Sequence, residues 1–349
     1  MSDKEERAKI LNKKLLIHPA FRETLSEIKK LNPKITNTSI DEKISFELDK
    51  VGGGIIELME KEEKYKLNPK DLSGMMTKGI DFLAYDESIN KFACLEGNAI
   101  ITSHSLIMLG KEDYIPSCFV TFYFYTHSEA YSTNSKFIKY SSEIDIDSKK
   151  DYLEDRTQFI LDSVPADSIL FIDGPLLGGQ ASNYTIKMNT ELLKKEVIPI
   201  FFVKNSSSNL IIDNYPKLKG KYNSDMDWSF KFLKQGERTG LFRYNEVAED
   251  RQGNVGHVKV FCYMKAYNVS PVRIEFHPDT LRKYGRRINE ILDSIYYLLL
   301  VQGDLKNPQV RPIAIAEKYA RETLKLFDID KLMREAGVVP TMNQERFAW

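Results

Sequence analysis

Two short apolar runs decide the fold of this chain: Ser168-Ile-Leu-Phe-Ile-Asp173 and Val197-Ile-Pro-Ile-Phe-Phe-Val203. Each is rich in Ile and Phe, which is typical of a central strand that is buried on both faces. A helical pattern of apolar residues precedes each run, over residues 149–164 and around Thr190 to Glu196. The order helix, strand, helix, strand predicts α/β organisation with a locally parallel sheet.

Further elements are expected on both sides of this stretch. Strands are predicted at Asp81–Tyr85, Phe92–Ile101, Cys118–Thr126, Val258–Lys265 and Val272–His277. Helices are predicted at Leu281–Val301 and Pro312–Phe327. We expect the first three strands to be antiparallel neighbours, so the sheet as a whole should be mixed and flanked by helices.

Two regions differ in composition from this pattern. Residues 8–31 carry apolar side chains at roughly helical spacing, and Ser39 with Glu42 resembles a capping box that opens a second helix. We expect these helices to form a packing or dimerisation arm. The stretch from Asn205 to Gly240 is polar and dotted with Asn, Ser and Gly, so it is predicted to be a long loop or insertion.

Composition limits the classes of function. The chain has 349 residues, of which 29% are charged, and its Lys+Arg 50 balance its Asp+Glu 50. No global field therefore draws it to nucleic acid or to an anionic membrane, and a nucleic-acid role needs a local basic patch. The three cysteines, Cys94, Cys118 and Cys262, have apolar or aromatic neighbours, which favours buried thiols over disulfides or zinc. Neither a signal-peptide core nor an apolar run of the roughly 18 residues that a membrane span requires is found, so we expect a cytoplasmic protein.

Two acids at strand ends are the first candidates for chemistry. The chain has no P-loop, no His-Glu-x-x-His helix, no Cys-x-x-Cys pair and no Gly-x-Ser-x-Gly elbow. Asp86 follows one apolar run and Asp173 another, and ligand sites in open α/β sheets gather at that end of the strands. Paired carboxylates suit Mg²⁺ or Mn²⁺, which activates water in phosphodiester hydrolysis. The alternative is that each Asp is only a turn or cap residue.

The same two segments resemble a known family. Asp81-Phe-Leu-Ala-Tyr-Asp86-Glu-Ser88 is similar to the first motif of the NurA nucleases, archaeal and bacterial DNA-end-processing enzymes in which this strand ends in Asp-Gly-Ser. Ser168-Ile-Leu-Phe-Ile-Asp173-Gly-Pro-Leu176 is similar to their second strand motif. The resemblance covers roughly residues 78–325 and implies an RNase H-like nuclease domain there, with an insertion at about 205–240. We assign 1–77 to an N-terminal helical arm and 326–349 to a C-terminal tail.

The resemblance also implies a set of site residues. On the helix between the two strands, Arg156 and Asp162 match the family's Arg and third acid, with Glu154 as the reserve acid. Lys204 ends a strand similar to one in the family and would steady the phosphate or the attacking hydroxide, while Glu317 stands where the family has a His. The implied ligands of Mn²⁺ or Mg²⁺ are Asp86, Asp162, Asp173 and Glu317.

Departures from the family pattern keep more than one function open. Glu87 stands where the first motif has Gly, and a carboxylate at Glu317 adds negative charge in place of an imidazole. The leading hypothesis is a metal-dependent DNA nuclease. A second is a weak or inactive relative that works as a DNA- or ATPase-binding module, and a third is an α/β enzyme with a closed pocket for a small phosphorylated substrate.

Partners follow from the resemblance and from local charge. The family implies a homodimer that encloses a DNA channel and docks on a HerA-type hexameric ATPase. Two basic groups would contact the DNA backbone if they line that channel, and are ordinary solvated charges otherwise. One is Lys217, Lys219 and Lys221; the other, which with Arg156 forms our predicted DNA contact, is Arg282, Lys283, Arg286 and Arg287. Arg273 and Glu275 alternate on a strand that is similar to one in the family, and we expect Glu275 to be structural.

Overall fold

The computed structural model describes residues 23–27, 54–70, 79–109, 114–131, 135–246, 257–302, 305 and 309–341. The chain divides into two units, Met1–Glu42 and Lys43–Trp349. In the first unit residues 23–27 are helical, and the rest of the helix predicted over 8–31 lies outside the described residues, as does the helix predicted to open at Ser39. All elements below belong to the second unit.

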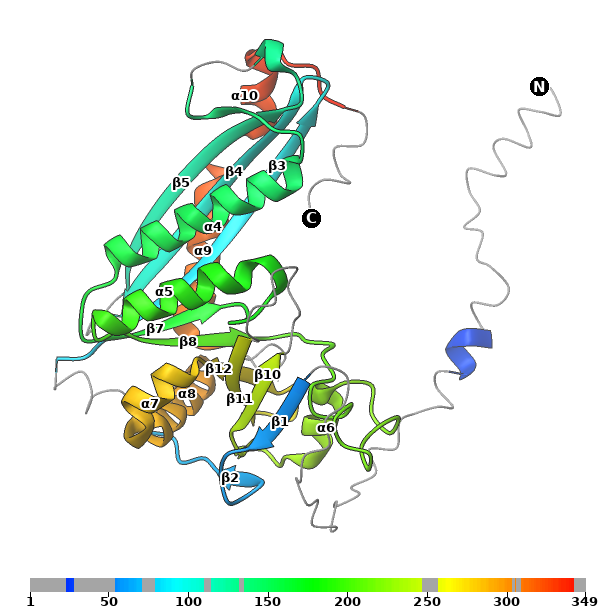
Figure 1. Cartoon of the computed structure of the whole chain (residues 1–349), viewed down its shortest axis with the longest axis vertical. Coiled ribbons are helices and arrows are strands. Elements are labelled where there is room, and N and C mark those ends of the chain that lie inside the picture. Colours follow the sequence, from blue (N-terminus) through cyan, green and yellow to red (C-terminus); the bar gives the residue numbers. More distant parts are fainter. Residues whose placement is uncertain are drawn as a thin grey trace, which may run out of the picture. The chain divides into compact units, whose positions relative to one another are not determined.

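One mixed sheet organises this unit (Figure 1). Its described strands are β1 (Gly54–Leu58), β2 (Lys64–Lys66), β3 (Asp81–Cys94), β4 (Gly97–Leu109), β5 (Tyr114–Thr126), β6 (Ile138–Tyr140), β7 (Ser168–Asp173), β8 (Ile198–Val203), β9 (Glu237–Thr239), β10 (Phe242–Glu246), β11 (His257–Lys265) and β12 (Val272–Phe276). They follow the order β1-β10-β11-β12-β8-β7-β3-β4-β5-β6, and β9 links β11 to β2. As predicted, β7 and β8 are parallel, and β3, β4 and β5 are antiparallel; β3 also pairs parallel to β7.

Helices cover both faces of the sheet. They are α4 (Ile144–Ser163), α5 (Ser182–Lys194), α6 (Asp225–Phe232), α7 (Pro278–Tyr284), α8 (Ile288–Gln302), α9 (Arg311–Lys325) and α10 (Ile329–Glu335), with short 3-10 turns η1 (Glu129–Tyr131), η2 (Gly179–Ala181) and η3 (Gly285–Arg287). Figure 1 shows α4 and α5 in front of the sheet and α9 behind it. The predicted class, a mixed α/β sheet flanked by helices, is confirmed.

Side-chain alternation along β7 separates two apolar cores. Ile169 and Phe171 pack in the core that α8 and α9 cover, whereas Leu170 and Ile172 pack in the core that α4 and α5 cover. All four side chains are buried, which explains why the run is apolar throughout. The strand order and this alternation fix the face on which each side chain at the carboxyl end of β7 lies.

Helix α4 forms where the periodicity predicts it. Its buried residues Leu153, Arg156 and Ile160 follow one another at intervals of three and four, so they share one face. The helix ends before Pro165 because Val164, the residue preceding the proline, is extended, with φ −82° and ψ 120°. The arginine in this face is the exception to its apolar character.

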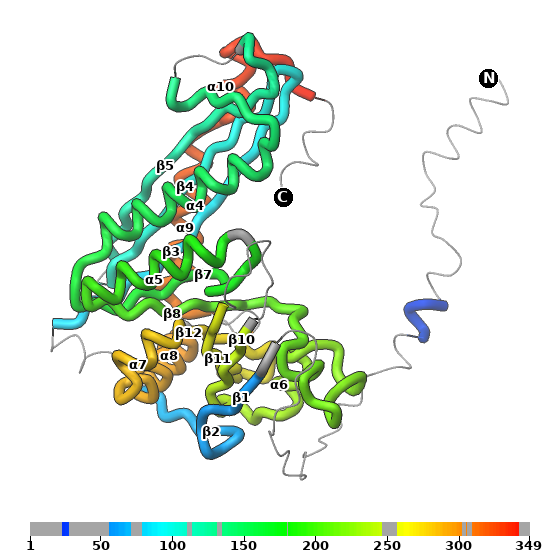
Figure 2. The backbone as a smooth tube through the Cα atoms, viewed as in Figure 1, coloured from blue at the N-terminus to red at the C-terminus, as the bar shows by residue number. Residues whose placement is uncertain are grey.

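The structure corrects the predicted strand at 92–101. The chain reverses at Leu95 and Glu96, so the predicted strand is divided between β3 and β4. Figure 2 shows these as two long segments that run side by side. Beyond Tyr85, β3 runs on past its pairing with β7 while β4 continues beside it. Leu-Glu is not one of the residue pairs that favour a two-residue hairpin turn, such as Asn-Gly or Asp-Gly, so the local sequence did not predict the turn.

Other predicted boundaries also change. The stretch predicted as a loop over 205–240 contains α6 and β9, and the region assigned to a helical arm contains β1 and β2. The helix expected at 281–301 is divided into α7, η3 and α8, and α5 begins at Ser182 rather than near Thr190. Cys94 and Cys262 are buried free thiols as predicted, whereas the free thiol of Cys118 is exposed. Among the described helices, none combines the length and apolar character needed to cross a membrane.

Candidate active site

Asp86 and Asp173 lie side by side at the carboxyl end of the central strands. The parallel pairing of β3 and β7 ends with Tyr85 opposite Ile172, and the two aspartates are the next residues on each strand. Strand β8 continues the same edge, with Phe202 opposite Asp173. The expectation that these two acids would meet at one sheet edge therefore agrees with the register.

Lys204 and Glu317 join the two aspartates on the same face. Side chains two residues apart on a strand share a face, so Asp86 follows Ala84, and Lys204 follows Phe202, toward the side that α9 covers. Helix α9 packs against β3 and carries Glu317. The Lys204 ammonium lies 2.8 Å from Asp173 Oδ2 and 3.3 Å from Glu317 Oε2.

The three acids of this cluster differ in how well their charged forms are stabilised. Burial, followed by the carboxylates of Asp173 and Glu87, raises the pKa of Asp86 to about 8. Burial also raises the pKa of Asp173, although the Lys204 ammonium acts against it. Burial would raise the pKa of Glu317 too, but Lys204 and Arg321 outweigh it and the net shift is downward. Asp86 is therefore the acid of the cluster whose charged form is least stabilised.

The opposite face of β3 carries a separate aromatic and polar cluster. The Tyr152 hydroxyl donates to Glu87, and the Tyr85 hydroxyl lies 2.6 Å from His104 Nδ1. The Arg156 guanidinium sits 5.3 Å from the centre of the Tyr85 ring. This cluster packs between β3, β4 and α4, behind the strand that presents Asp86 to the α9 side.

Asp162 is not brought to the other acids. It is an exposed residue in the last turn of α4, where it accepts a hydrogen bond of 2.7 Å from Gln158 Nε2. That turn precedes the start of β7, while Asp173 is the last of six residues in the strand, so the strand alone separates them by roughly 17 Å. The reserve acid Glu154 is also exposed and lines a cleft between α4 and α5. Helical spacing could not tell which face of the sheet α4 covers.

The predicted DNA contacts are likewise away from this edge. Arg156 is only 8% exposed, which removes it from direct contact with a duplex. Lys283 Nζ lies 2.7 Å from Glu196, which precedes β8, so the group 282–287 stands at the amino end of that strand. Lys217, Lys219 and Lys221 are exposed. They belong to the segment that starts with Lys204, at the carboxyl end of β8.

Comparison with protein families decides the relationship. A family model described as the NurA domain matches residues 86–322. This chain belongs to the NurA family. The match begins at Asp86 and includes Asp173, Lys204 and Glu317. No curated protein sequence gives a match.

Solved structures with a similar arrangement include other NurA proteins. The NurA nuclease from Sulfolobus solfataricus is 12% identical, with 91% of this chain and 98% of that chain covered and a TM-score of 0.49. Another NurA structure is 8% identical, with 87% and 94% covered and a TM-score of 0.42. Ciona intestinalis endonuclease V, bound to DNA containing an inosine, is 13% identical, with 74% and 92% covered and a TM-score of 0.35. At these values the likeness assigns no role to any residue of this chain.

Sequence analysis missed one partner in the candidate site, Arg321, and one in the separate cluster behind β3, Tyr152. Arg321 pairs with Glu317 across one turn of α9, and this spacing of four residues is a pattern that can reveal it. Tyr152 bonds to Glu87 from a position 65 residues away, for which no local pattern exists. Within the described residues, no group of three or more His, Cys, Asp or Glu side chains is arranged to hold a metal ion.

Proposed function

We propose that this NurA-family chain is a metal-dependent DNA nuclease that hydrolyses phosphodiester bonds at the carboxyl ends of β3 and β7. One observation carries the proposal: Asp86 and Asp173 stand side by side on adjacent parallel strands, with the Lys204 ammonium 2.8 Å from Asp173. Membership of the NurA family supports a nuclease function. Membership of this family also supports DNA as the substrate of our proposed reaction.

The donor set fits a divalent cation that keeps part of its hydration. Mg²⁺ is usually held by one or two carboxylates together with water and substrate phosphate oxygens, and Mn²⁺ accepts the same hard ligands. Asp86 and Asp173 supply two such carboxylates. Burial, with repulsion from Asp173 as the next cause, raises the pKa of Asp86 to about 8. A cation between them would relieve that repulsion. Glu317 is held by Lys204 and Arg321, so we leave it out of the ligand pair.

Each residue of the cluster then has a chemical task. Asp86 and Asp173 would hold the ion, which, when bound, supplies an acidified water and neutralises charge on the phosphate. Lys204 provides a fixed positive charge at the same edge and would stabilise the negative charge that builds up on the phosphate oxygens. Glu317 orients Lys204 through its carboxylate, 3.3 Å from the ammonium.

We extend the proposal to the partners that the family resemblance implies. The chain would act as a homodimer around DNA, together with a HerA-type hexameric ATPase, in the processing of DNA ends. The exposed lysines at 217, 219 and 221 would contact the DNA backbone, because their segment begins at Lys204. Arg282 and its neighbours are omitted from these contacts.

A specific observation favours a second candidate, a NurA-like subunit that binds DNA or the ATPase without cutting. Lys204 already satisfies Asp173 and Glu317, which leaves Asp86 as the carboxylate of the cluster with no cation in contact among the described residues. In that case the cluster would be a structural ion pair at the sheet edge. The two candidates predict opposite results in a cleavage assay.

Cleavage of end-labelled DNA with Mn²⁺ or Mg²⁺ tests the proposal. Wild type is expected to cut, and Asp86→Asn and Asp173→Asn are each expected to lose activity by at least about 100-fold, since the ion supplies several kcal/mol of stabilisation. Glu322→Gln, an exposed acid on α9, is the control and should cut like wild type. A wild type that binds DNA without cutting would support the second candidate, and equal cutting by all variants would sink the site assignment.

A further inference from the structure

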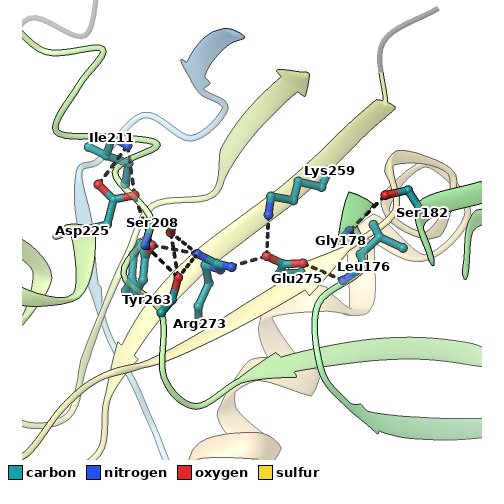
Figure 3. Close-up of polar contacts among 11 residues, drawn as sticks. Leu176, Gly178, Ser182, Ser208, Ile211, Asp225, Lys259, Tyr263, Arg273 and Glu275 are labelled. Carbon is teal, nitrogen blue, oxygen red and sulfur yellow. Dashed lines mark hydrogen bonds and ion pairs between the residues drawn. The ribbon is translucent and has the colours of Figure 1, made fainter. Parts of the chain in front are cut away.

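A fully buried acid on β12 holds the turn that follows Asp173. Glu275 is 0% exposed, and its Oε2 accepts a hydrogen bond of 2.8 Å from the Leu176 backbone N–H (Figure 3). Its other oxygen, Oε1, lies 2.7 Å from Lys259 Nζ and 2.8 Å from Arg273 Nε. Both carboxylate oxygens are therefore engaged, one of them with the backbone of a loop.

That loop is tied down at two points within three residues of Asp173. The backbone N–H of Gly174 donates to the Phe202 carbonyl at 2.8 Å, and Leu176 donates to Glu275. Gly174 has φ +104°, a conformation that favours glycine, so the turn leaves β7 sharply. The direction in which Asp173 leaves the strand thus depends on the anchor at Leu176.

The same ion pair also holds the segment that follows Lys204. Arg273 Nη1 donates to Ser206 Oγ at 3.0 Å and to Ser208 Oγ (Figure 3). Ser206 is two residues beyond Lys204. Since Arg273 pairs opposite Val203 and Glu275 opposite Phe201, both charged residues lie on the strand beside β8, next to the two loops.

Stability does not explain why these charges are buried. Arg273 and Lys259 are each 4% exposed and Glu275 is fully buried, and removing such ions from water costs as much as their attraction returns. Apolar side chains of similar size would often serve the core equally well. What apolar side chains cannot supply is a hydrogen-bond acceptor for Leu176 and donors for the two serines.

We propose that Arg273 and Glu275 are positioning residues that clamp the loops after β7 and β8 and so set the placement of Asp173 relative to Lys204. Neither residue touches the reacting atoms, because both act through the loops. The inference rests on the proposed nuclease function for its consequence in catalysis. The clamp itself concerns only the two loops, so it can be measured without an activity assay.

Hydrogen–deuterium exchange tests the clamp on the full chain. Ser206→Ala/Ser208→Ala removes two of the acceptors of Arg273, together with the bonds between the serines, and leaves the buried charges and the Tyr263 hydroxyl in place. It should speed exchange over 204–210. Glu275→Gln weakens the charged bonds and should speed exchange over 174–178. Ser207→Ala, an exposed serine between the two, is the matched control and should exchange like wild type.

Steady-state kinetics tests the consequence. In the serine double variant, assayed at a temperature at which it is folded, kcat is expected to fall by about 10-fold or more, as for outer-shell partners of metal ligands, with KM for DNA unchanged. A purely structural role would instead lower the melting temperature and leave kcat untouched in the protein that remains folded. Ser207→Ala should keep the wild-type kcat.

The outcomes separate the two proposals. Unchanged exchange in both loops, in the serine variant and in Glu275→Gln alike, overturns the clamp. Faster exchange with an unchanged kcat overturns its role in catalysis. An inactive wild type with faster loop exchange in the variants counts against the nuclease function and leaves the clamp supported.

Discussion

Lys204 determines which acids of the cluster are paired with a cation. Its ammonium contacts Asp173 and Glu317 but not Asp86, on the far side of Asp173. Burial and two nearby carboxylates therefore raise the pKa of Asp86, while the pKa of Glu317 falls because Lys204 and Arg321 outweigh its burial. A cation is electrostatically most favoured at the Asp86 and Asp173 end of the cluster.

Asp162 gives a direct contrast between sequence and structure. Asp162→Asn is expected to keep wild-type cleavage, because this acid is exposed on α4 and bonds only to Gln158 among the contacts described. Asp173→Asn is expected to lose it. The measurement is the rate of DNA cleavage with Mn²⁺ for the two variants side by side. If both variants were inactive, the helix would contribute a ligand after all and the two-acid site would be incomplete.

His104 makes stability sensitive to acid. Burial lowers the pKa of His104 to about 4, so between pH 6.5 and 4 the unfolded chain binds a proton that the folded chain does not. The free energy of unfolding should thus fall as the pH drops through this window, by about 3 kcal/mol from this residue. In His104→Gln this contribution disappears. Urea unfolding at several pH values measures the slope of the free energy of unfolding against pH for wild type and for His104→Gln. Equal slopes would contradict a lowered pKa of His104.

The sequence predicted the residues that end apolar runs and missed those that meet across the fold. Asp86 and Asp173 could be selected from the sequence because each follows an apolar run that predicts a buried strand. Parallel strands align their carboxyl ends at one sheet edge. Asp162 was selected because it matches the family's third acid in the resemblance, and that match does not give the side of the sheet on which the helix packs. Glu275 and Leu176 are 99 residues apart, so no local pattern connects them.

The β3–β4 hairpin depends on one glycine. A Cβ at Gly97 would lie 2.1 Å from the Tyr125 carbonyl oxygen on β5, which is backbone and cannot easily move. Gly97→Ala is expected to lower the free energy of unfolding by roughly 1–3 kcal/mol or more through overpacking. Thermal or urea unfolding measures the change.

Gly285 is the matched control for that substitution. It has helical φ −51° and ψ −35°, and a Cβ there meets no atom within 4 Å. Gly285→Ala should be neutral or stabilise the protein by up to about 1 kcal/mol. A loss of stability equal to that of Gly97→Ala would show that the close contact on β5 is not the cause.

The loop after β8, not α7, is expected to bind DNA. Replacing Lys217, Lys219 and Lys221 by Gln should reduce the slope of log affinity against log salt by up to about 3, since each lysine neutralises one phosphate. Replacing Arg282, Lys283 and Arg286 should leave the slope unchanged, because Lys283 pairs with Glu196 at the amino end of β8. Fluorescence anisotropy over a salt series measures both. The reverse result would place the DNA path at the other edge of the sheet.

At the scale of the whole molecule, order along the chain was predictable and division into elements was less so. The parallel centre follows from alternating helical and apolar segments, and it holds in β3, β7 and β8. The reversal at Leu95, whose N–H donates to the Val339 carbonyl, and the helix α6, which packs against β11, both contact distant parts of the chain. With a formal net charge of zero, attraction to DNA must also come from local patches rather than from the molecule as a whole.

We propose above that Asp86 and Asp173 hold a divalent ion at the sheet edge. Crystals of the protein soaked in Mn²⁺ test it through anomalous scattering from the metal. We predict one peak within coordinating distance of both carboxylates, and its loss in Asp173→Asn. Crystals that bind Mn²⁺ elsewhere but show no peak there, with Lys204 still bridging Asp173 and Glu317, would contradict a metal site formed by these two carboxylates.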